Sequence, residues 1–157
     1  MNDLNYLKST LLSALILLCF SFLDNAHAQY RSGSTELGVV LGEPTGVSIQ
    51  VWQSGTRAID GALAWSLGRD DKIHVHADYL KHDQLSVDRG SLTFFYGIGA
   101  RAILADDAKF GPRFPLGLHY VIPDSRFSVF FEVAPIFDLV PATDFDVNGG
   151  IGVRYFL

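Results

Sequence analysis

Hydrophobic and polar residues alternate along most of the chain after residue 34. The pattern is clearest in the final segment, Asn148 to Leu157, where every second side chain falls on the same side of an extended strand. One side carries Ile151, Val153, Tyr155 and Leu157, and the other carries Gly150, Gly152, Arg154 and Phe156. A sheet that closes on itself is able to end on such an apolar strand, because the first strand then covers its edge.

Seven earlier segments show the same two-residue period and are separated by clusters of Gly, Pro, Asp, Asn and Ser. They span residues 36–41, 47–52, 58–67, 73–80, 92–104, 113–122 and 127–137. No segment after the N-terminal leader has a helical period. The pattern therefore predicts an all-β fold of eight antiparallel strands joined by turns.

Alternation fits both a soluble lipocalin-like barrel and a membrane barrel, which differ in the face that points inward. The minority face of these strands combines glycine with charged or polar residues: Gly38, Gly97, Gly99, Gly117, Asp60, Asp78, Arg101, His119, Glu132 and Arg154. Eight strands leave an interior only wide enough for side chains, which suits small residues and paired charges. We therefore expect an up-and-down transmembrane β-barrel, with a soluble periplasmic carrier of an apolar ligand as the alternative.

The N-terminus predicts export. An apolar run from Leu11 to Phe22 is too short to span a membrane as a helix and is followed by an Ala-His-Ala motif at residues 26–28. The prediction is a cleaved signal peptide at 1–28, a short segment at 29–34 and a barrel domain at 35–157. We expect the mature protein in the outer membrane of the cell.

Cysteine content, net charge and hydrophobic content exclude several classes of structure and function. The only cysteine of the 157 residues is Cys19, within the leader, so the mature chain is expected to hold no disulfide and no thiolate site. The formal net charge of −5 becomes about −4 without the leader, and there is no basic block. Nucleic acid is therefore not an expected partner. A hydrophobic content of 48% argues against disorder.

Several runs of residues carry a family resemblance: LGEPT at 41–45, IDGALAW at 59–65, HVHADYL at 74–80, YGIGAR at 96–101 and EVAPIFDLVPATDFD at 132–146. With the leader and the aromatic closing strand, the chain resembles small eight-stranded outer-membrane barrels of the outer membrane protein A transmembrane-domain type. It is most similar to an uncharacterised, spirochaete-type group of these barrels. The resemblance implies a barrel of unknown activity, with an extracellular or host protein as one candidate partner.

Charged residues on the minority face predict an ion network inside the barrel. Its expected members are Asp60, Asp78, Arg101, Glu132 and Arg154. We expect Arg101 and Arg154 to pair with the three carboxylates, because guanidinium and carboxylate groups form bidentate pairs. A narrow ion-conducting pore with a charged constriction is the functional alternative.

Histidines suggest a second alternative. His74 and His76 point to the same face of one expected strand as Asp78, and a third ligand such as His119 from another strand would complete a zinc site. A hydrogen-bonded network is the favoured interpretation, so no metal or cofactor is predicted.

Acidic residues gather near the expected last loop, at Asp138, Asp144 and Asp146. They are interpreted as solvated charges, with calcium or bridging to lipopolysaccharide as the alternative. Five aromatic residues are candidates for interfacial girdles: Trp52, Trp65, Tyr79, Tyr120 and Tyr155.

Catalysis is not predicted. A lipid-A deacylase needs a serine activated by a histidine, which on one strand would read His-x-Ser, and that motif is absent from the sequence. A lipid-A-modifying enzyme remains a lesser alternative to a structural or surface-interaction role. The expected partners are outer-membrane lipid and, during insertion, the outer-membrane assembly machinery, with the mature protein as a monomer.

Overall fold

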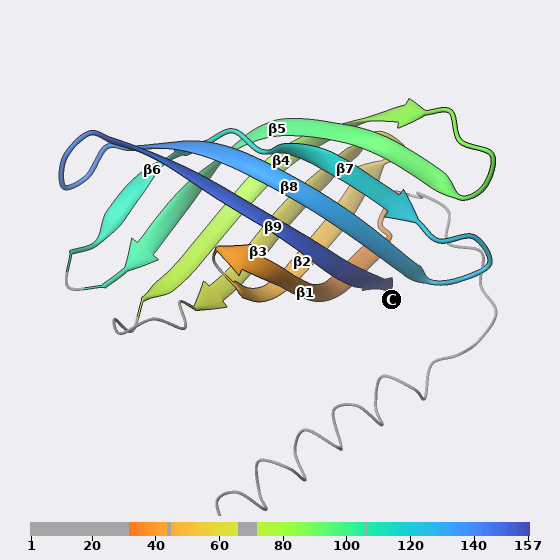
Figure 1. Ribbon diagram of the computed structural model, residues 1–157, viewed down its shortest axis with the longest axis horizontal. Coiled ribbons are helices and arrows are strands. Elements are labelled where there is room, and N and C mark those ends of the chain that lie inside the picture. The colour runs from red at the N-terminus through yellow and green to blue at the C-terminus, as the bar shows by residue number, and fades with distance from the viewer. Residues whose placement is uncertain (1–31, 44, 66–71, 106) are drawn as a thin grey trace, which may run out of the picture.

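The computed structural model describes residues 32–43, 45–65, 72–105 and 107–157, which form a single antiparallel sheet curled into a barrel (Figure 1). The expectations for the signal peptide at 1–28 and for residues 29–31 of the segment 29–34 lie outside these residues. The sheet contains nine strands: β1 (Thr35–Glu43), β2 (Thr45–Ser54), β3 (Arg57–Trp65), β4 (Ile73–Leu85), β5 (Ser91–Leu104), β6 (Lys109–Arg113), β7 (Leu116–Val121), β8 (Phe127–Asp138) and β9 (Asp144–Phe156).

The nine strands form an eight-membered ring, because β6 and β7 are two halves of one interrupted strand. Both halves pair with β5 on one side and with β8 on the other. The interruption falls at Phe114 and Pro115, where proline lacks the amide hydrogen that a continuous ladder requires. Pairing of β1 with β9 closes the ring. The predicted all-β, eight-stranded antiparallel barrel is confirmed.

Strand bounds differ from the prediction mainly at the ends. The polar run from Lys81 to Leu85 was predicted as a loop but continues β4. It still alternates, with His82 buried inside and Lys81 outside, and Lys81 Nζ donates to Tyr96 Oη at 3.1 Å. The closing strand likewise begins four residues earlier than expected, at Asp144. Charged residues conceal the two-residue period in both places.

Apolar side chains cover the outside of the barrel. Ile98, Leu41 and Ile151 are 57%, 60% and 54% exposed, and similarly exposed apolar residues occur on every strand of the ring. In β9 the side chains of Arg154 and Phe156 are buried, whereas Leu157, the residue after the strand, is 72% exposed. The predicted faces of the strands therefore agree with the structure.

Two buried apolar clusters occupy part of the interior. One contains Trp52, Ala58, Val121 and Phe156, and the other contains Leu80, Phe95 and Phe130. Trp52 is fully buried, so its proposed place in an outer aromatic girdle is wrong. Its position in β2 directs the side chain into the barrel, although tryptophan often lies at a membrane interface. Tyr79, Tyr120 and Tyr155 lie on the outer face, whereas the side chain of Trp65 is outside the described part.

The barrel has two different ends. At the terminal end lie Thr35 and Phe156 with the turns 55–56, 86–90 and 122–126. At the distal end lie the connection 139–143 and the strand ends Glu43, Thr45, Trp65, Ile73, Leu104 and Lys109. The β8–β9 hairpin projects at the distal end (Figure 1), because β1 pairs with β9 only from Gly149 onward. Among the described residues there is no helix long and apolar enough to cross a membrane.

Candidate functional site

The lumen of the barrel is the candidate functional site, because the two-residue period of the strands sends their charged side chains inward. All five predicted network residues face the interior: Asp60, Asp78, Arg101, Glu132 and Arg154. Except for Glu132, which is half-buried, they are 2% to 3% exposed. Buried polar groups require partners, and the structure shows three separate clusters of them along the lumen.

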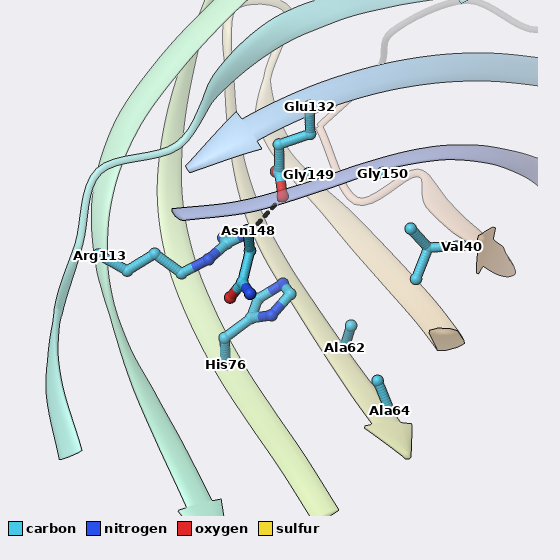
Figure 2. Close-up of a pocket in the computed structure, with 9 residues that line it drawn as sticks. All are labelled: Val40, Ala62, Ala64, His76, Arg113, Glu132, Asn148, Gly149 and Gly150. Atoms are coloured by element: carbon cyan, nitrogen blue, oxygen red, sulfur yellow. Dashed lines mark hydrogen bonds and ion pairs between the residues drawn. The ribbon is translucent and has the colours of Figure 1, made fainter. Parts of the chain in front are cut away.

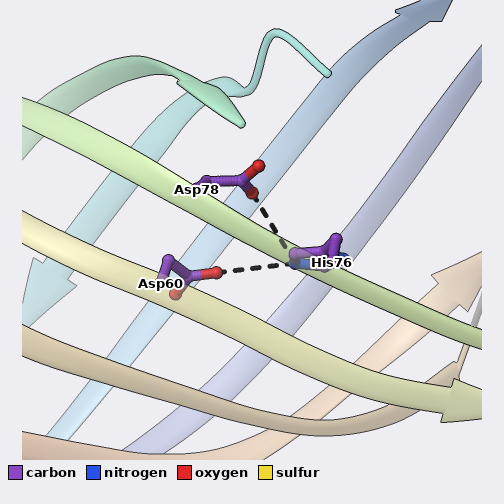
Figure 3. A group of neighbouring side chains, drawn as sticks. All are labelled: Asp60, His76 and Asp78. Carbon is purple, nitrogen blue, oxygen red and sulfur yellow. Dashed lines mark ion pairs between the residues drawn. The ribbon is translucent and has the colours of Figure 1, made fainter. Parts of the chain in front are cut away.

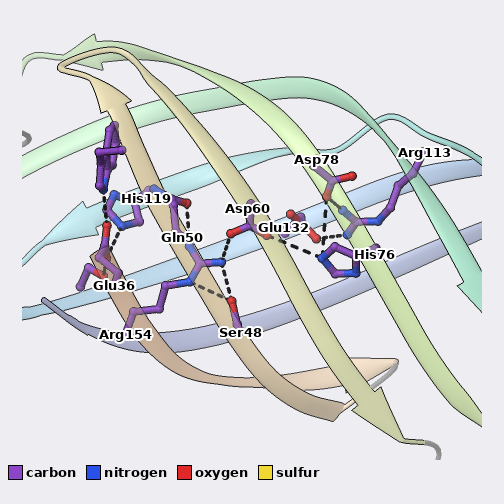
Figure 4. A network of polar contacts seen from close by, with 12 residues as sticks. Glu36, Ser48, Gln50, Asp60, His76, Asp78, Arg113, His119, Glu132 and Arg154 are labelled. Atoms are coloured by element: carbon purple, nitrogen blue, oxygen red, sulfur yellow. Dashed lines mark hydrogen bonds and ion pairs between the residues drawn. The ribbon is translucent and has the colours of Figure 1, made fainter. Parts of the chain in front are cut away.

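The first cluster lies at the terminal end around Glu36, a fully buried carboxylate. Trp52 Nε1 donates to Glu36 Oε1 at 2.6 Å, and Ser128 Oγ donates to Oε2. His119 Nε2 lies 3.1 Å from the same Oε2 (Figure 4). Sequence analysis did not single out Glu36, although its alternation with the outward-facing Leu37 places it on the inner face.

Aromatic rings surround this terminal cluster. The ring centroid of His82 lies 4.5 Å from that of Trp52, 5.7 Å from that of His119 and 5.4 Å from that of Phe95. His82 Nδ1 also lies 3.0 Å from Thr93 Oγ1. These packed rings fill the terminal half of the lumen.

The second cluster, in the middle of the lumen, is built on Arg154. Its Nε and Nη2 donate to Ser48 Oγ at 2.9 and 2.6 Å, its Nη1 donates to Gln50 Oε1 at 2.8 Å, and its Nη2 also donates to Asp60 Oδ1. The guanidinium carbon lies 3.9 Å from the centre of the Phe130 ring, a cation–π distance. The structure thus joins Arg154 and Asp60, as the sequence suggested.

A second arginine extends this middle cluster. Arg113 donates through Nη1 to Asp78 Oδ2 and through Nη2 to Glu132 Oε1, so one guanidinium joins strands β4, β6 and β8 (Figure 4). Sequence analysis did not include Arg113 in the network. Its even spacing from Gly117 and His119, which were assigned to the minority face, would have identified it.

The third cluster lies at the distal end and corrects the expected pairing of Arg101. Arg101 Nη2 donates to Asp138 Oδ2 at 2.6 Å, and its Nη1 donates to Asp146 Oδ2 at 2.7 Å. Among the described residues, Arg101 forms no hydrogen bond with Asp60, Asp78 or Glu132, because the tilt of the strands carries it toward the distal rim. Lys109 Nζ lies 3.3 Å from Asp144 and 3.5 Å from Asp138. The acidic residues expected to be solvated loop charges are therefore paired with these two cations.

The histidines are not arranged as the alternative of a zinc site requires. His74, His76 and His119 do not form a group: in the described residues, the one group of three or more potential ligands consists of Asp60, His76 and Asp78 (Figure 3). His119 instead belongs to the terminal cluster with Glu36. The shear of the barrel, which the alternation does not reveal, places β3 and β4 side chains together and separates both from β7.

A small pocket opens above the middle cluster. Figure 2 shows His76, Arg113 and Glu132 on one side of it and small residues on the other. The small residues are Val40, Ala62, Ala64, Gly149 and Gly150, and Asn148 completes the lining. The pocket has a volume of about 20 Å³, which is enough for about one water molecule. The distal half of the lumen is therefore incompletely filled.

Comparison with known proteins identifies the fold. No protein-family model matches the chain, and no curated protein matches it. The structure is similar to the crystal structure of the N-terminal β-barrel domain of Pseudomonas aeruginosa OprF, with a TM-score of 0.61 and 13% sequence identity over 80% of this chain and 98% of that one. The chain therefore has the fold of an outer-membrane β-barrel domain. The resemblance to the spirochaete-type group stays a prediction.

Proposed function

We propose that this protein is a non-catalytic β-barrel of the outer membrane with a structural or surface-interaction role, and that small and ion-paired side chains fill its lumen. The apolar outer face carries the proposal: Leu41, Ile98, Ile151 and similar side chains are exposed around the whole ring while the charged groups of the strands point inward. Soluble monomers seldom expose apolar patches larger than a few hundred Å². In a membrane, lipid covers such an apolar surface, so the free-energy cost of exposing it to water does not arise.

The orientation follows from the leader and the two barrel ends. In an exported chain whose barrel begins and ends on the periplasmic side, at Thr35 and Phe156, the distal end of the barrel would face the outside. The 139–143 connection exposes Leu139 and Val140, at 55% and 52%, which makes it a candidate contact for an extracellular partner. Outer-membrane lipid and the assembly machinery are the other proposed partners of a monomeric barrel.

The filled terminal half supports a role other than conduction. The ring of Trp52 packs against those of His82 and His119 across the lumen. Phe156 belongs to the same buried apolar cluster as Trp52. A soluble carrier of an apolar ligand is less well supported, because the inward face presents charged groups such as Arg113 and Asp78 in place of an apolar cavity. A deacylase is also less well supported, since the hydroxyl of the buried Ser128 donates to the Glu36 carboxylate.

Substitution on the outer face tests the proposal. Val153 points outward from the closing strand, so Val153→Arg should cost about 2 to 4 kcal/mol of folding free energy near the bilayer midplane and reduce insertion into outer-membrane vesicles. Val153→Leu is the matched control and should insert normally. Membrane fractionation and the heat-dependent shift in gel migration measure both. If Val153→Arg folded normally and both proteins were recovered in the soluble periplasm, the outer face would be a water-exposed one and the proposal would fail.

A further inference from the structure

The strongest unassigned feature of the lumen is the group formed by Asp60 on β3 and by His76 and Asp78 on β4 (Figure 3). His76 Nε2 lies 3.6 Å from Asp60 Oδ2 and 3.7 Å from Asp78 Oδ2. All three donor atoms lie within 4.8 Å of one another. We propose that these three side chains bind a transition-metal dication of the zinc class.

The separations fit an ion better than a direct salt bridge. A charge-assisted hydrogen bond between imidazolium and carboxylate measures about 2.7 to 2.9 Å, well below the observed 3.6 and 3.7 Å. Zinc holds nitrogen and oxygen ligands at about 2.0 to 2.2 Å, which places neighbouring ligands about 3.4 Å apart in tetrahedral geometry. The two separations measured from the His76 imidazole are within about 0.3 Å of this ligand spacing.

The arginines of the middle cluster orient the two carboxylates as outer partners. Asp60 accepts from Arg154 through Oδ1 and directs Oδ2 at His76. Asp78 uses one lone pair of Oδ2 for Arg113, which leaves a second for an ion. Outer partners of this kind hold metal ligands in position and commonly change metal affinity 10- to 100-fold.

Charge balance also favours a cation. The middle and terminal clusters hold four carboxylates, Glu36, Asp60, Asp78 and Glu132, and two guanidiniums, Arg113 and Arg154. With all four carboxylates ionised, two negative charges are left in a region of low dielectric constant. A dication compensates this excess without a further protein residue.

Access and coordination are provided by the pocket above the cluster. His76 belongs both to the three-residue group and to the pocket lining, so the ion site connects with the distal half of the lumen. The cavity of about 20 Å³ has room for one water molecule as a fourth ligand. One imidazole and two carboxylates with an open position suit zinc, and also cobalt as a spectroscopic substitute. This inference concerns the lumen and does not depend on the membrane location proposed above.

Cobalt titration of the full chain, folded in detergent and checked by heat-dependent gel migration, tests the site. We expect one Co²⁺ per chain, with the visible ligand-field absorption of a four- or five-coordinate ion, and displacement by Zn²⁺. His76→Gln and Asp60→Asn should each weaken Co²⁺ binding by at least about 100-fold, since they remove a direct ligand. His74→Gln is the matched control, because His74 shares the inner face of β4 but lies outside the group; its affinity should equal that of the wild type.

Two results would overturn the inference: absence of the Co²⁺ absorption from folded wild-type protein at stoichiometric concentration, or equal binding by wild type and His76→Gln. Loss of binding in His74→Gln equal to that in His76→Gln would overturn it as well. If the ligand variants do not fold, measurements on the wild-type protein alone test the site. Zn²⁺ should then raise its unfolding temperature reversibly with chelator, because an ion that binds only the folded state stabilises it; an unchanged temperature contradicts the site.

Discussion

The terminal and distal halves of the lumen are built from the same alternating strands, yet different forces hold them together. In the terminal half, large rings such as Trp52, Phe95 and His82 pack against one another and against a single buried carboxylate, Glu36. In the distal half, small residues leave a pocket and the contacts are ion pairs, of which that of Arg101 with Asp146 reaches a 44% exposed carboxylate. The difference shows that the close packing of rings stabilises the terminal half, whereas ion pairs stabilise the distal half.

Glycines make the close packing of the terminal half possible. A Cβ atom at Gly152 would collide with the Phe130 ring, and one at Gly117 would lie 2.6 Å from the Phe95 ring. The aromatic rings thus occupy the space that side chains at these positions would take. Near the pocket, by contrast, a Cβ atom at Gly149 would have the Glu132 carbonyl oxygen, 3.7 Å away, as its nearest neighbour. Four substitutions, taken in three groups, test this difference between the two halves.

The largest effect is expected for Arg154→Ala, in the middle cluster. The change leaves Asp60 buried without its guanidinium and removes the bonds to Ser48 and Gln50, and breaking a buried ion pair in this way costs about 3 to 5 kcal/mol. Its unfolding midpoint in urea, followed by gel migration in lipid vesicles, should fall strongly. Arg57→Ala, in an exposed position, is the control and should leave the midpoint unchanged. An unchanged midpoint for Arg154→Ala would show that the middle cluster does not stabilise the barrel.

An intermediate effect is expected for a pair of glycine variants on the inner face of β9. Gly152→Ala places its Cβ against the Phe130 ring and 2.6 Å from the Val39 carbonyl oxygen, and such overpacking costs about 1 to 3 kcal/mol. Gly150→Ala meets first a methyl group of Val40, at 2.7 Å, which is able to rotate away. It should cost less than about 1 kcal/mol, since alanine also reduces the entropy of the unfolded chain. Equal costs in the same urea measurement would remove the distinction between a tightly packed and a loosely packed half.

The smallest effect is expected for Lys109→Ala at the distal rim. Lys109 and its partner Asp144 are 34% and 62% exposed, and ion pairs at this exposure contribute less than about 1 kcal/mol. The small loss should shrink further in high salt, which screens exposed charges. Measuring the unfolding midpoint of wild type and variant at low and high salt checks this. A loss comparable with that of Arg154→Ala would show that the rim pairs are as important as the buried ones.

The sequence alone was sufficient to predict the architecture of the barrel and whether individual side chains point into or out of it. A period of two assigns every second residue to one face, so the inward positions of Arg154 and Asp60 follow from their neighbours. It was not sufficient for partners across the lumen, because these depend on strand tilt and shear. Arg101 therefore pairs with Asp138 and Asp146 and not with the carboxylates expected. Trp52 was misassigned because its amphipathic ring suits an interface as well as a lumen that offers the Glu36 carboxylate.

The short β1–β2 hairpin has a consequence for association between barrels. Residues 144–148 of β9 extend beyond the end of β1, so within the described chain one side of this stretch has no neighbouring strand. Exposed backbone of this kind is a template for pairing with a second chain, and inward-pointing charges are one way in which natural sheets discourage such pairing. Asp144 and Asp146 alternate along this stretch and are held by Lys109 and Arg101. The rim charges thus protect an open sheet edge against edge-to-edge aggregation, apart from any contribution they make to stability.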